Sequence, residues 1–123
     1  MTKEFVKSKN AVVMYLSGEL DQYAAAELKN KIDVEMENSD KKNLIMNMTD
    51  VTMMDSSGIG LIIGRYKFLQ ARGGKVFVCG GNNSVKKVIT LSGIEKLIPY
   101  YNTLREAENA AEACQKIKES DKK

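Results

Sequence analysis

Two adjacent serines behind an aspartate are the side chains whose types and spacing point most directly to chemistry. The segment at 55–64 reads DSSGIGLIIG, so Ser56 and Ser57 stand at the expected start of a helix. One serine can cap that helix by accepting a hydrogen bond from a free backbone N–H, which contributes about 1 kcal/mol. The other hydroxyl is then available to solvent or to a partner. The residues alone leave open which serine takes which role.

Phosphorylation of such a hydroxyl adds about 1.5–2 negative charges. The helix dipole and the free N–H groups tolerate that charge, so the fold can survive the modification. Asp55 is adjacent and Asp21 is expected on a neighbouring loop, so the phosphate would join an acidic cluster. On a partner surface shaped for a neutral hydroxyl, the added charge costs several kcal/mol. The pattern therefore predicts a binding switch that needs no change of conformation.

The glycines of the same helix form a strip of small residues. Ser57, Gly60 and Gly64 share one helix face, which Lys67 and Ala71 continue. The strip either packs tightly against a neighbouring element or lets a partner protein approach the backbone, and the sequence does not separate these two interpretations. The opposite face is expected to be apolar and consists of Ile59, Ile62, Ile63, Tyr66 and Leu69.

Composition excludes several classes of function. The chain has 123 residues with a formal net charge of +3 and contains no histidine. The missing histidine removes Ser–His–Asp and Cys–His catalysis and the commonest transition-metal ligand. The spacing GxGxxxG inside a helix does not match a dinucleotide loop, and no GxxxxGK(S/T) phosphate loop occurs. We therefore expect no catalytic residues, no metal and no cofactor.

Charge and hydropathy patterning also limit the partners and the location. Lysines and acids are interspersed and tryptophan is absent, so no nucleic-acid footprint is visible. No apolar run approaches the roughly 20 residues of a membrane span, and the N-terminus has no signal-type apolar core. Cys79 and Cys114 form no CxxC motif and are expected to be reduced thiols packed like small hydrophobes. A cytoplasmic protein without membrane contact is the expectation.

The elements that must position the serines alternate between strands and helices. We expect strands at 4–8, 11–17, 44–48, 75–80 and 96–100, and helices at 21–38, 57–71, 84–92 and 103–118. Asp21, Ser84 and Thr103 are the expected helix starts, and Gly18 is expected to end the second strand. The order ββαβαβαβα predicts an α/β fold with a small mixed sheet flanked by helices. It forms one domain at 1–118, followed by a frayed tail at 119–123.

Three strand-to-helix loops are expected to meet at one end of this sheet. They are Gly18–Asp21, Thr52–Ser57 and Gly80–Ser84. Function in parallel α/β sheets tends to lie beyond the carboxyl ends of the strands. The sequence thus predicts a site that includes the paired serines.

MDSSGIGLIIGRYK, with SGELDQYAAAELK upstream and VKKVITLSGIEKLIPYY downstream, resembles the anti-sigma factor antagonists of the STAS domain family. The resemblance covers about residues 4–115. Its most specific part is a DS(S/T)G(I/L)G motif that follows a GE(I/L)D motif. The paired serines and the GRYK continuation resemble the sporulation type more than the general-stress type.

The resemblance implies a binding protein and not an enzyme. Such a protein binds an anti-sigma factor that is also a serine kinase, and so frees a sigma factor. The kinase phosphorylates the serine directly after the aspartate, here Ser56, with Ser57 as the alternative, and the product no longer binds. A serine phosphatase restores the active form, and the protein alone is expected to be a monomer. STAS relatives also include scaffold subunits of larger signalling assemblies without a release switch, which is the alternative function.

The family's other site residues transfer by motif. Ser92, Gly93 and Ile94 match a turn of the family that is equally explained by a glycine helix cap. Gln22-Tyr23 stands where sporulation-type members often carry a histidine, which bears on partner specificity. The implied partner-binding residues are Gly18, Glu19, Leu20, Asp21, Asp55, Ser57, Gly58, Gly60 and Gly64.

Overall fold

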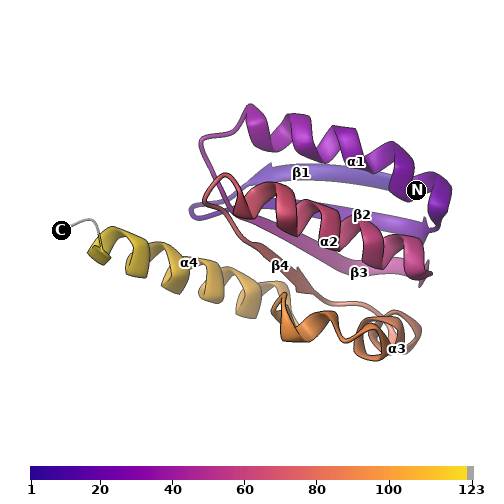
Figure 1. Cartoon of the computed structure of the whole chain (residues 1–123). Coiled ribbons are helices and arrows are strands. Elements are labelled where there is room, and N and C mark those ends of the chain that lie inside the picture. The colour runs from indigo at the N-terminus through magenta and orange to yellow at the C-terminus, as the bar shows by residue number, and fades with distance from the viewer. Residues whose placement is uncertain (122–123) are drawn as a thin grey trace.

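The computed structural model describes residues 1–121 and shows a single five-stranded sheet with helices on both faces (Figure 1). The strand order is β1-β2-β3-β4-β5, with β1 antiparallel to β2 and the other pairs parallel. The predicted α/β class and mixed sheet are confirmed. The elements are β1 (Thr2–Lys7), β2 (Val12–Leu20), α1 (Gln22–Glu37), β3 (Leu44–Met54), α2 (Ser56–Gln70), β4 (Val76–Cys79), α3 (Asn83–Ser92), a 3-10 turn (Ile94–Lys96), β5 (Tyr100–Tyr101) and α4 (Leu104–Asp121).

Two central strands are longer than the sequence pattern predicted. β2 continues past Gly18 to Leu20, and β3 continues past Met48 to Met54, because the two strands pair in parallel up to Leu20 opposite Met54. Gly18 does not end β2. It lies inside the strand at a register irregularity with a φ of 106°, which glycine adopts without strain. The expected strand at 96–100 is wrong for most of its length, since a 3-10 turn comes first and β5 holds only two residues.

The helix starts are set by short polar side chains. Asp21 caps α1 as predicted, and its Oδ1 accepts a hydrogen bond of 2.9 Å from Ala24 N. The predicted cap at Ser84 is wrong, because Asn82 accepts from Val85 N at 2.9 Å and α3 begins at Asn83. Thr103 opens α4 as expected, and its Oγ1 accepts from Glu106 N at 3.2 Å.

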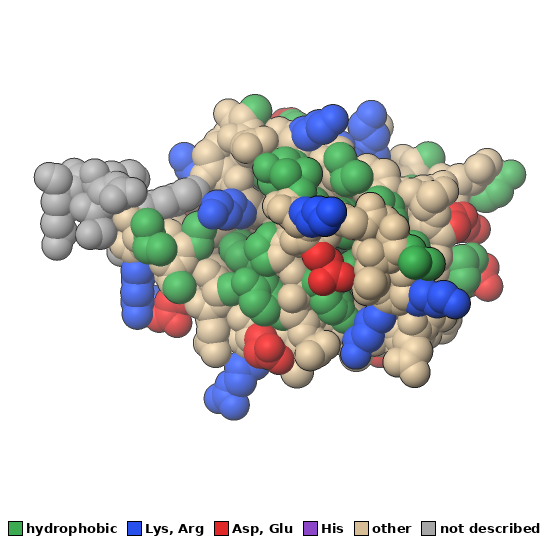
Figure 2. All heavy atoms as spheres, turned by 60° about the horizontal axis from the view of Figure 1, so that its bottom comes forward, with side chains coloured by type: hydrophobic (Ala, Val, Ile, Leu, Met, Phe, Trp, Pro, Cys, Tyr) green, Lys and Arg blue, Asp and Glu red, His purple; other side chains and the backbone are tan. Residues whose placement is uncertain are grey.

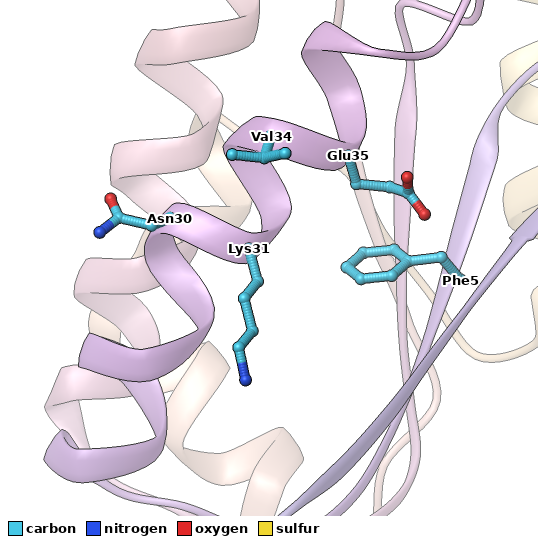
Figure 3. A pocket seen from close by; sticks show the side chains of 5 residues that line it. All are labelled: Phe5, Asn30, Lys31, Val34 and Glu35. Carbon is cyan, nitrogen blue, oxygen red and sulfur yellow. The ribbon is translucent and has the colours of Figure 1, made fainter.

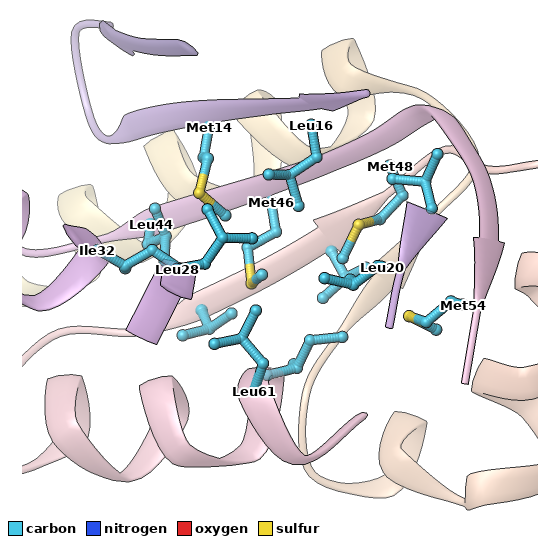
Figure 4. Close-up of a cluster of buried hydrophobic side chains, with 14 of the residues drawn as sticks. Met14, Leu16, Leu20, Leu28, Ile32, Leu44, Met46, Met48, Met54 and Leu61 are labelled. Atoms are coloured by element: carbon cyan, nitrogen blue, oxygen red, sulfur yellow. The ribbon is translucent and has the colours of Figure 1, made fainter. Parts of the chain in front are cut away.

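The main core lies between the sheet and the layer formed by α1, α2 and α3 (Figures 1 and 4). Alternate residues of the strands point into it, as the pleat of a strand requires. Figure 4 shows Met14, Met46 and Leu28 directed toward one another between strands and helices. Leu20 and Met54 close this core at the end where β2 and β3 stop, and Leu61 of α2 packs further inside it. The paired serines at the start of α2 therefore lie directly above packed side chains of the core.

The second face of the sheet is covered by α4. Val13, Ile45 and Phe77 point to this side and pack with Ala107 and Ala111. Figure 2, turned to bring the lower side of Figure 1 forward, shows hydrophobic side chains at the surface among Lys, Arg and acidic residues. Partly buried hydrophobic residues on this face are Tyr15, Tyr101, Leu104, Ala110 and Cys114. One helix thus shields this side less completely than three helices shield the other.

The two cysteines lie in different surroundings. Cys79 is buried in β4, and burial raises the pKa of its thiol to about 12. It behaves as the packed small hydrophobe that the sequence predicted. Cys114 on α4 is half-buried and also packs against the cluster on this face as a free thiol, as expected, although it is less enclosed than Cys79.

The end of the domain was expected at 118. The helix α4 continues to Asp121, so residues 119–121 of the expected frayed tail belong to its assigned range. Residues 122–123 lie outside the described residues. The domain boundary at 118 stays a prediction.

Candidate functional site

The loop between β3 and α2 is a single residue, Asp55. Its backbone is extended, and its Oδ1 accepts a hydrogen bond of 2.8 Å from Ser57 N, which makes Asp55 the N-cap of α2. The Asp55 carbonyl also accepts from Gly58 N at 3.0 Å. The expectation that one of the two serines caps the helix is therefore wrong, because the aspartate before them already fills that role.

This cap leaves both serine hydroxyls unused by the helix start. Ser56 is the first residue of α2 and is exposed, while Ser57 is half-buried. Within the described part of the chain, neither hydroxyl takes part in a hydrogen bond. Ser56 thus presents a fixed, solvent-accessible oxygen at the positive end of a helix dipole.

The three predicted loops meet at the right-hand end of the sheet in Figure 1, where β2 and β3 stop and α1 and α2 begin. Asp55 N donates to Leu20 O at 3.4 Å, which joins the serine loop to the loop before α1. Asn82 Nδ2 donates to Thr52 O at 3.2 Å, which joins it to the loop before α3. Tyr100 Oη donates to Gly80 O at 2.7 Å and fixes that third loop from β5. The expected convergence of the loops is confirmed.

Two of the expected partner-binding residues cannot touch a partner. Leu20 is completely buried, and Gly58 is buried on the inner side of α2. A Cβ added at Gly58 would collide with Met54 Cγ and would stand 2.7 Å from Met54 Sδ and 3.1 Å from Leu20 Cδ2. Gly58 therefore allows the first turn of α2 to lie close against the ends of β2 and β3. Both residues support the site from beneath it.

The remaining loop residues face outward or lie at the surface. Glu19 and Asp55 are exposed, and Gly18 and Asp21 are half-buried. Next to them, Gln22 is exposed, and Tyr23 in the first turn of α1 is 77% exposed. The site thus combines carboxylates, a free hydroxyl and an accessible aromatic ring.

The glycine strip of α2 is open. Nothing lies within 4 Å of a Cβ built on Gly60 or on Gly64. Of the two interpretations of the strip, tight packing on a neighbouring element is thereby excluded. Gly60 and Gly64 border a recess of about 280 Å³ between α1 and α2, together with Ala25, Ala26, Lys29, Leu61 and Arg65.

Residues 2–107 match the STAS domain. The chain belongs to the STAS domain family. A relative named anti-sigma F factor antagonist, from Paenibacillus polymyxa, is 31% identical over 99 residues, which cover 80% of this chain and 85% of that protein. The resemblance stated from the sequence is therefore confirmed, and the name agrees with the sporulation type.

Solved structures give the same result for this STAS domain. The anti-sigma factor antagonist SpoIIAA in its unphosphorylated form superposes with a TM-score of 0.77 at 28% identity, over 91% of this chain and 97% of that one. The phosphorylated form of SpoIIAA, described as a Bacillus cell fate determinant, gives a TM-score of 0.67 at 28% identity, over 89% of this chain and 98% of that one.

A buried ion pair under the glycine strip escaped the sequence prediction. Arg65 of α2 has a side chain only 6% exposed, and its Nε lies 2.8 Å from Asp33 Oδ1 of α1. The sequence analysis predicted that Ile63 and Tyr66 point inward, but both are only partly buried, and Arg65 between them is buried instead. Arg65 occurs one turn after Leu61 and one turn before Leu69, and this spacing was the signal that it points inward.

Another groove of this STAS domain lies between β1 and α1. It has a volume of about 380 Å³ and is lined by Phe5, Asn30, Lys31, Val34 and Glu35. Figure 3 shows the Phe5 ring and the Glu35 side chain facing each other across it. None of the predicted site residues lines this groove, so we do not connect it with the serine loop.

The described residues lack two other kinds of feature, a cluster of metal ligands and a membrane-spanning helix. Within residues 1–121, no three His, Cys, Asp or Glu side chains are grouped so that they could hold a metal ion. No helix in that range has the length and apolar character needed to cross a bilayer.

Proposed function

We propose that this STAS protein is an anti-sigma factor antagonist whose binding is switched off by phosphorylation of Ser56. In its unphosphorylated form it binds an anti-sigma factor that is also a serine kinase, and a sigma factor is released. A serine phosphatase reverses the modification. The proposal is supported by the family, by the names of the relatives, and by the DSSG motif at the start of α2.

The exposed, unbonded hydroxyl of Ser56 is the observation that carries this proposal. Because Asp55 caps α2, a phosphate on Ser56 displaces no hydrogen bond of the fold. Ser57 is less suitable as an acceptor, since it is half-buried. The modified protein is therefore expected to keep its structure.

Release of the partner then follows from charge. Asp55 is adjacent to Ser56, and Glu19 and Asp21 belong to the joined loop. A partner that fits these carboxylates and a neutral hydroxyl must accommodate about two further negative charges after phosphorylation. An unpaired charge buried in an interface costs about 2–5 kcal/mol, enough to separate the two proteins.

Phosphorylation in vitro tests the acceptor. We expect incubation with the anti-sigma factor kinase and ATP to place one phosphate on Ser56, located by peptide mass spectrometry. Ser56→Ala is expected to abolish labelling, and the matched variant Ser57→Ala to retain it. Phosphate confined to Ser57 would reassign the acceptor.

Binding tests the switch. Ser56→Asp is expected to weaken binding to the anti-sigma factor by at least about 30-fold, which corresponds to the lower end of that interface cost. The control is Asn109→Asp, which adds one negative charge at an exposed position on α4, the helix on the other face of the sheet. Unchanged affinity of Ser56→Asp would contradict the proposal. A monomer in sedimentation is expected, whereas large particles would favour the scaffold alternative.

A further inference from the structure

The recess between α1 and α2 contains a buried cation whose hydrogen-bonding capacity is unused. We define the α1–α2 recess by Ala25, Ala26 and Lys29 of α1 and by Gly60, Gly64 and Arg65 of α2. Arg65 lies 2.8 Å from Asp33, yet neither Arg65 Nε nor Asp33 Oδ1 has a hydrogen-bond partner, because the two groups are poorly aligned. Across the described residues, the Arg65 side chain has no other ion pair and no hydrogen bond.

This is an unusual state for a guanidinium. Its Nε–H is buried without a hydrogen-bond acceptor, whereas buried polar groups in folded proteins almost always have partners. The Arg65 side chain is 94% buried and lines a recess with room for further atoms. A ligand that accepts hydrogen bonds would therefore complete the surroundings of Arg65.

The lining of the α1–α2 recess defines the chemistry of that ligand. Lys29 is exposed at its edge, and no carboxylate is among the lining residues. Asp33 already neutralises the charge of Arg65, so Lys29 leaves the recess with one net positive charge above a floor of alanine, glycine and Leu61, which suits a small oxyanion. A carboxylate matches the planar guanidinium through two parallel hydrogen bonds.

We propose that the α1–α2 recess receives an Asp or Glu side chain of the anti-sigma factor. The inference rests on the proposed function, because the recess continues the surface that begins at Ser56. Ser56, Gly60 and Gly64 follow one another at intervals of four residues and so share one side of α2. A protein that covers Ser56 and lies along this side reaches Lys29 and Arg65 without leaving the helix.

The recess begins near the switch and extends away from it. One helical turn separates Ser56 from Gly60, a rise of about 6 Å along the axis, whereas Arg65 follows Ser56 by nine residues, a rise of about 13.5 Å. A partner carboxylate held by Arg65 therefore lies beyond the first turn of α2, where salt screens most of its repulsion from a phosphate on Ser56. The recess thus adds binding contacts to the same partner surface, and the charge of the phosphate acts at Ser56 itself.

The test measures affinity for the anti-sigma factor used in the phosphorylation assay. Lys29→Glu is expected to weaken binding about tenfold or more, since it places like charges together. The matched control is Lys75→Glu, an exposed lysine before β4 that is not among the recess residues. Gly64→Leu fills the recess without meeting any atom within 4 Å of its Cβ and is expected to weaken binding with no loss of thermal stability. Wild-type affinity in both Lys29→Glu and Gly64→Leu would overturn the proposal.

A second measurement separates this inference from the proposed function. If the wild-type protein does not bind the anti-sigma factor, the proposed function fails and the recess is tested by itself with sodium acetate. We expect the NMR signal of the Arg65 Nε–H group to shift and saturate with acetate in the wild type and not in Gly64→Leu, with sodium chloride as the ionic-strength control. A signal that does not saturate with acetate would then overturn the carboxylate site.

Discussion

The two sides of α2 use the same residue type for opposite purposes. On the inner side, Gly58 lies where any Cβ would meet Met54 and Leu20. On the outer side, Gly60 and Gly64 have no atom within 4 Å of a Cβ position. Glycine in the middle of a helix costs about 0.5–1 kcal/mol relative to alanine. Packing accounts for that cost at Gly58, whereas no contact within the described chain accounts for it at Gly60 and Gly64, which agrees with the partner surface proposed above.

The comparison shows that a glycine motif does not indicate by itself which of its members face a partner. Gly58 and Gly60 belong to one short motif and are two positions apart. Their directions around the helix make the first a structural requirement and the second a free surface. Arg65 stands where the two sides meet, since it is buried and also borders the α1–α2 recess.

The largest expected effect concerns the ion pair at this boundary. Asp33→Ala leaves the Arg65 charge buried without a counter-charge and is expected to lower the free energy of unfolding by about 3 kcal/mol. Urea denaturation measures this decrease in the free energy of unfolding. The control is the double variant Asp33→Leu with Arg65→Met, which removes both charges and is expected to recover most of the loss. A double variant less stable than Asp33→Ala would show that the pair itself stabilises the fold.

An intermediate effect is expected from the same substitution on the two sides of α2. Gly58→Ala is expected to destabilise the protein by about 1–2 kcal/mol, because its Cβ overpacks the contact with Met54 and Leu20. Gly60→Ala is expected to stabilise it by about 0.5–1 kcal/mol, because the methyl group meets nothing. Urea denaturation measures the change in the free energy of unfolding for each variant. Changes of opposite sign support the comparison, and changes of the same sign would contradict it.

The smallest expected effect is a pH dependence of the stability that comes from the Asp33–Arg65 pair. Burial raises the pKa of Asp33 above its ordinary value of 3.8, and the attraction of Arg65 opposes this only in part. The folded state therefore holds the Asp33 proton more tightly than the unfolded state does. The resulting stability is fully present below pH 3.8 and is lost as the pH rises through the folded pKa. Compared with Asp33→Asn, the wild type should be relatively more stable at pH 4 than at pH 7, as measured by urea denaturation at both values.

Periodicity predicted the sheet and the helices, and it failed where tertiary pairing overrides local pattern. Thr49 and Asp50 look like the end of a strand, yet β3 continues because β2 supplies a parallel partner up to Met54. The order of elements and the meeting of three loops could be predicted, because parallel strands place their carboxyl ends together.

The details of the site could not be predicted, because the sequence offers several residues for the same structural role and does not show which one takes it. Asp55, Ser56 and Ser57 can all cap a helix, and only the fold shows that Asp55 does so. Asn82 and Ser84 present the same ambiguity before α3. Arg65 could not be paired with Asp33 from sequence, since their contact depends on how α1 lies beside α2.

Under the proposed phosphorylation of Ser56, the cap at Asp55 has a consequence for how a kinase meets its substrate. The hydroxyl beside it is held at the start of a folded helix, and the residues just before that helix are joined to two other loops. Docking therefore freezes little additional backbone freedom, whereas a linear peptide DSSGIG must order every residue at a cost of about 1–2 kcal/mol each. A kinase that recognises this surface should therefore phosphorylate the folded protein and not unfolded or newly synthesised copies of the chain.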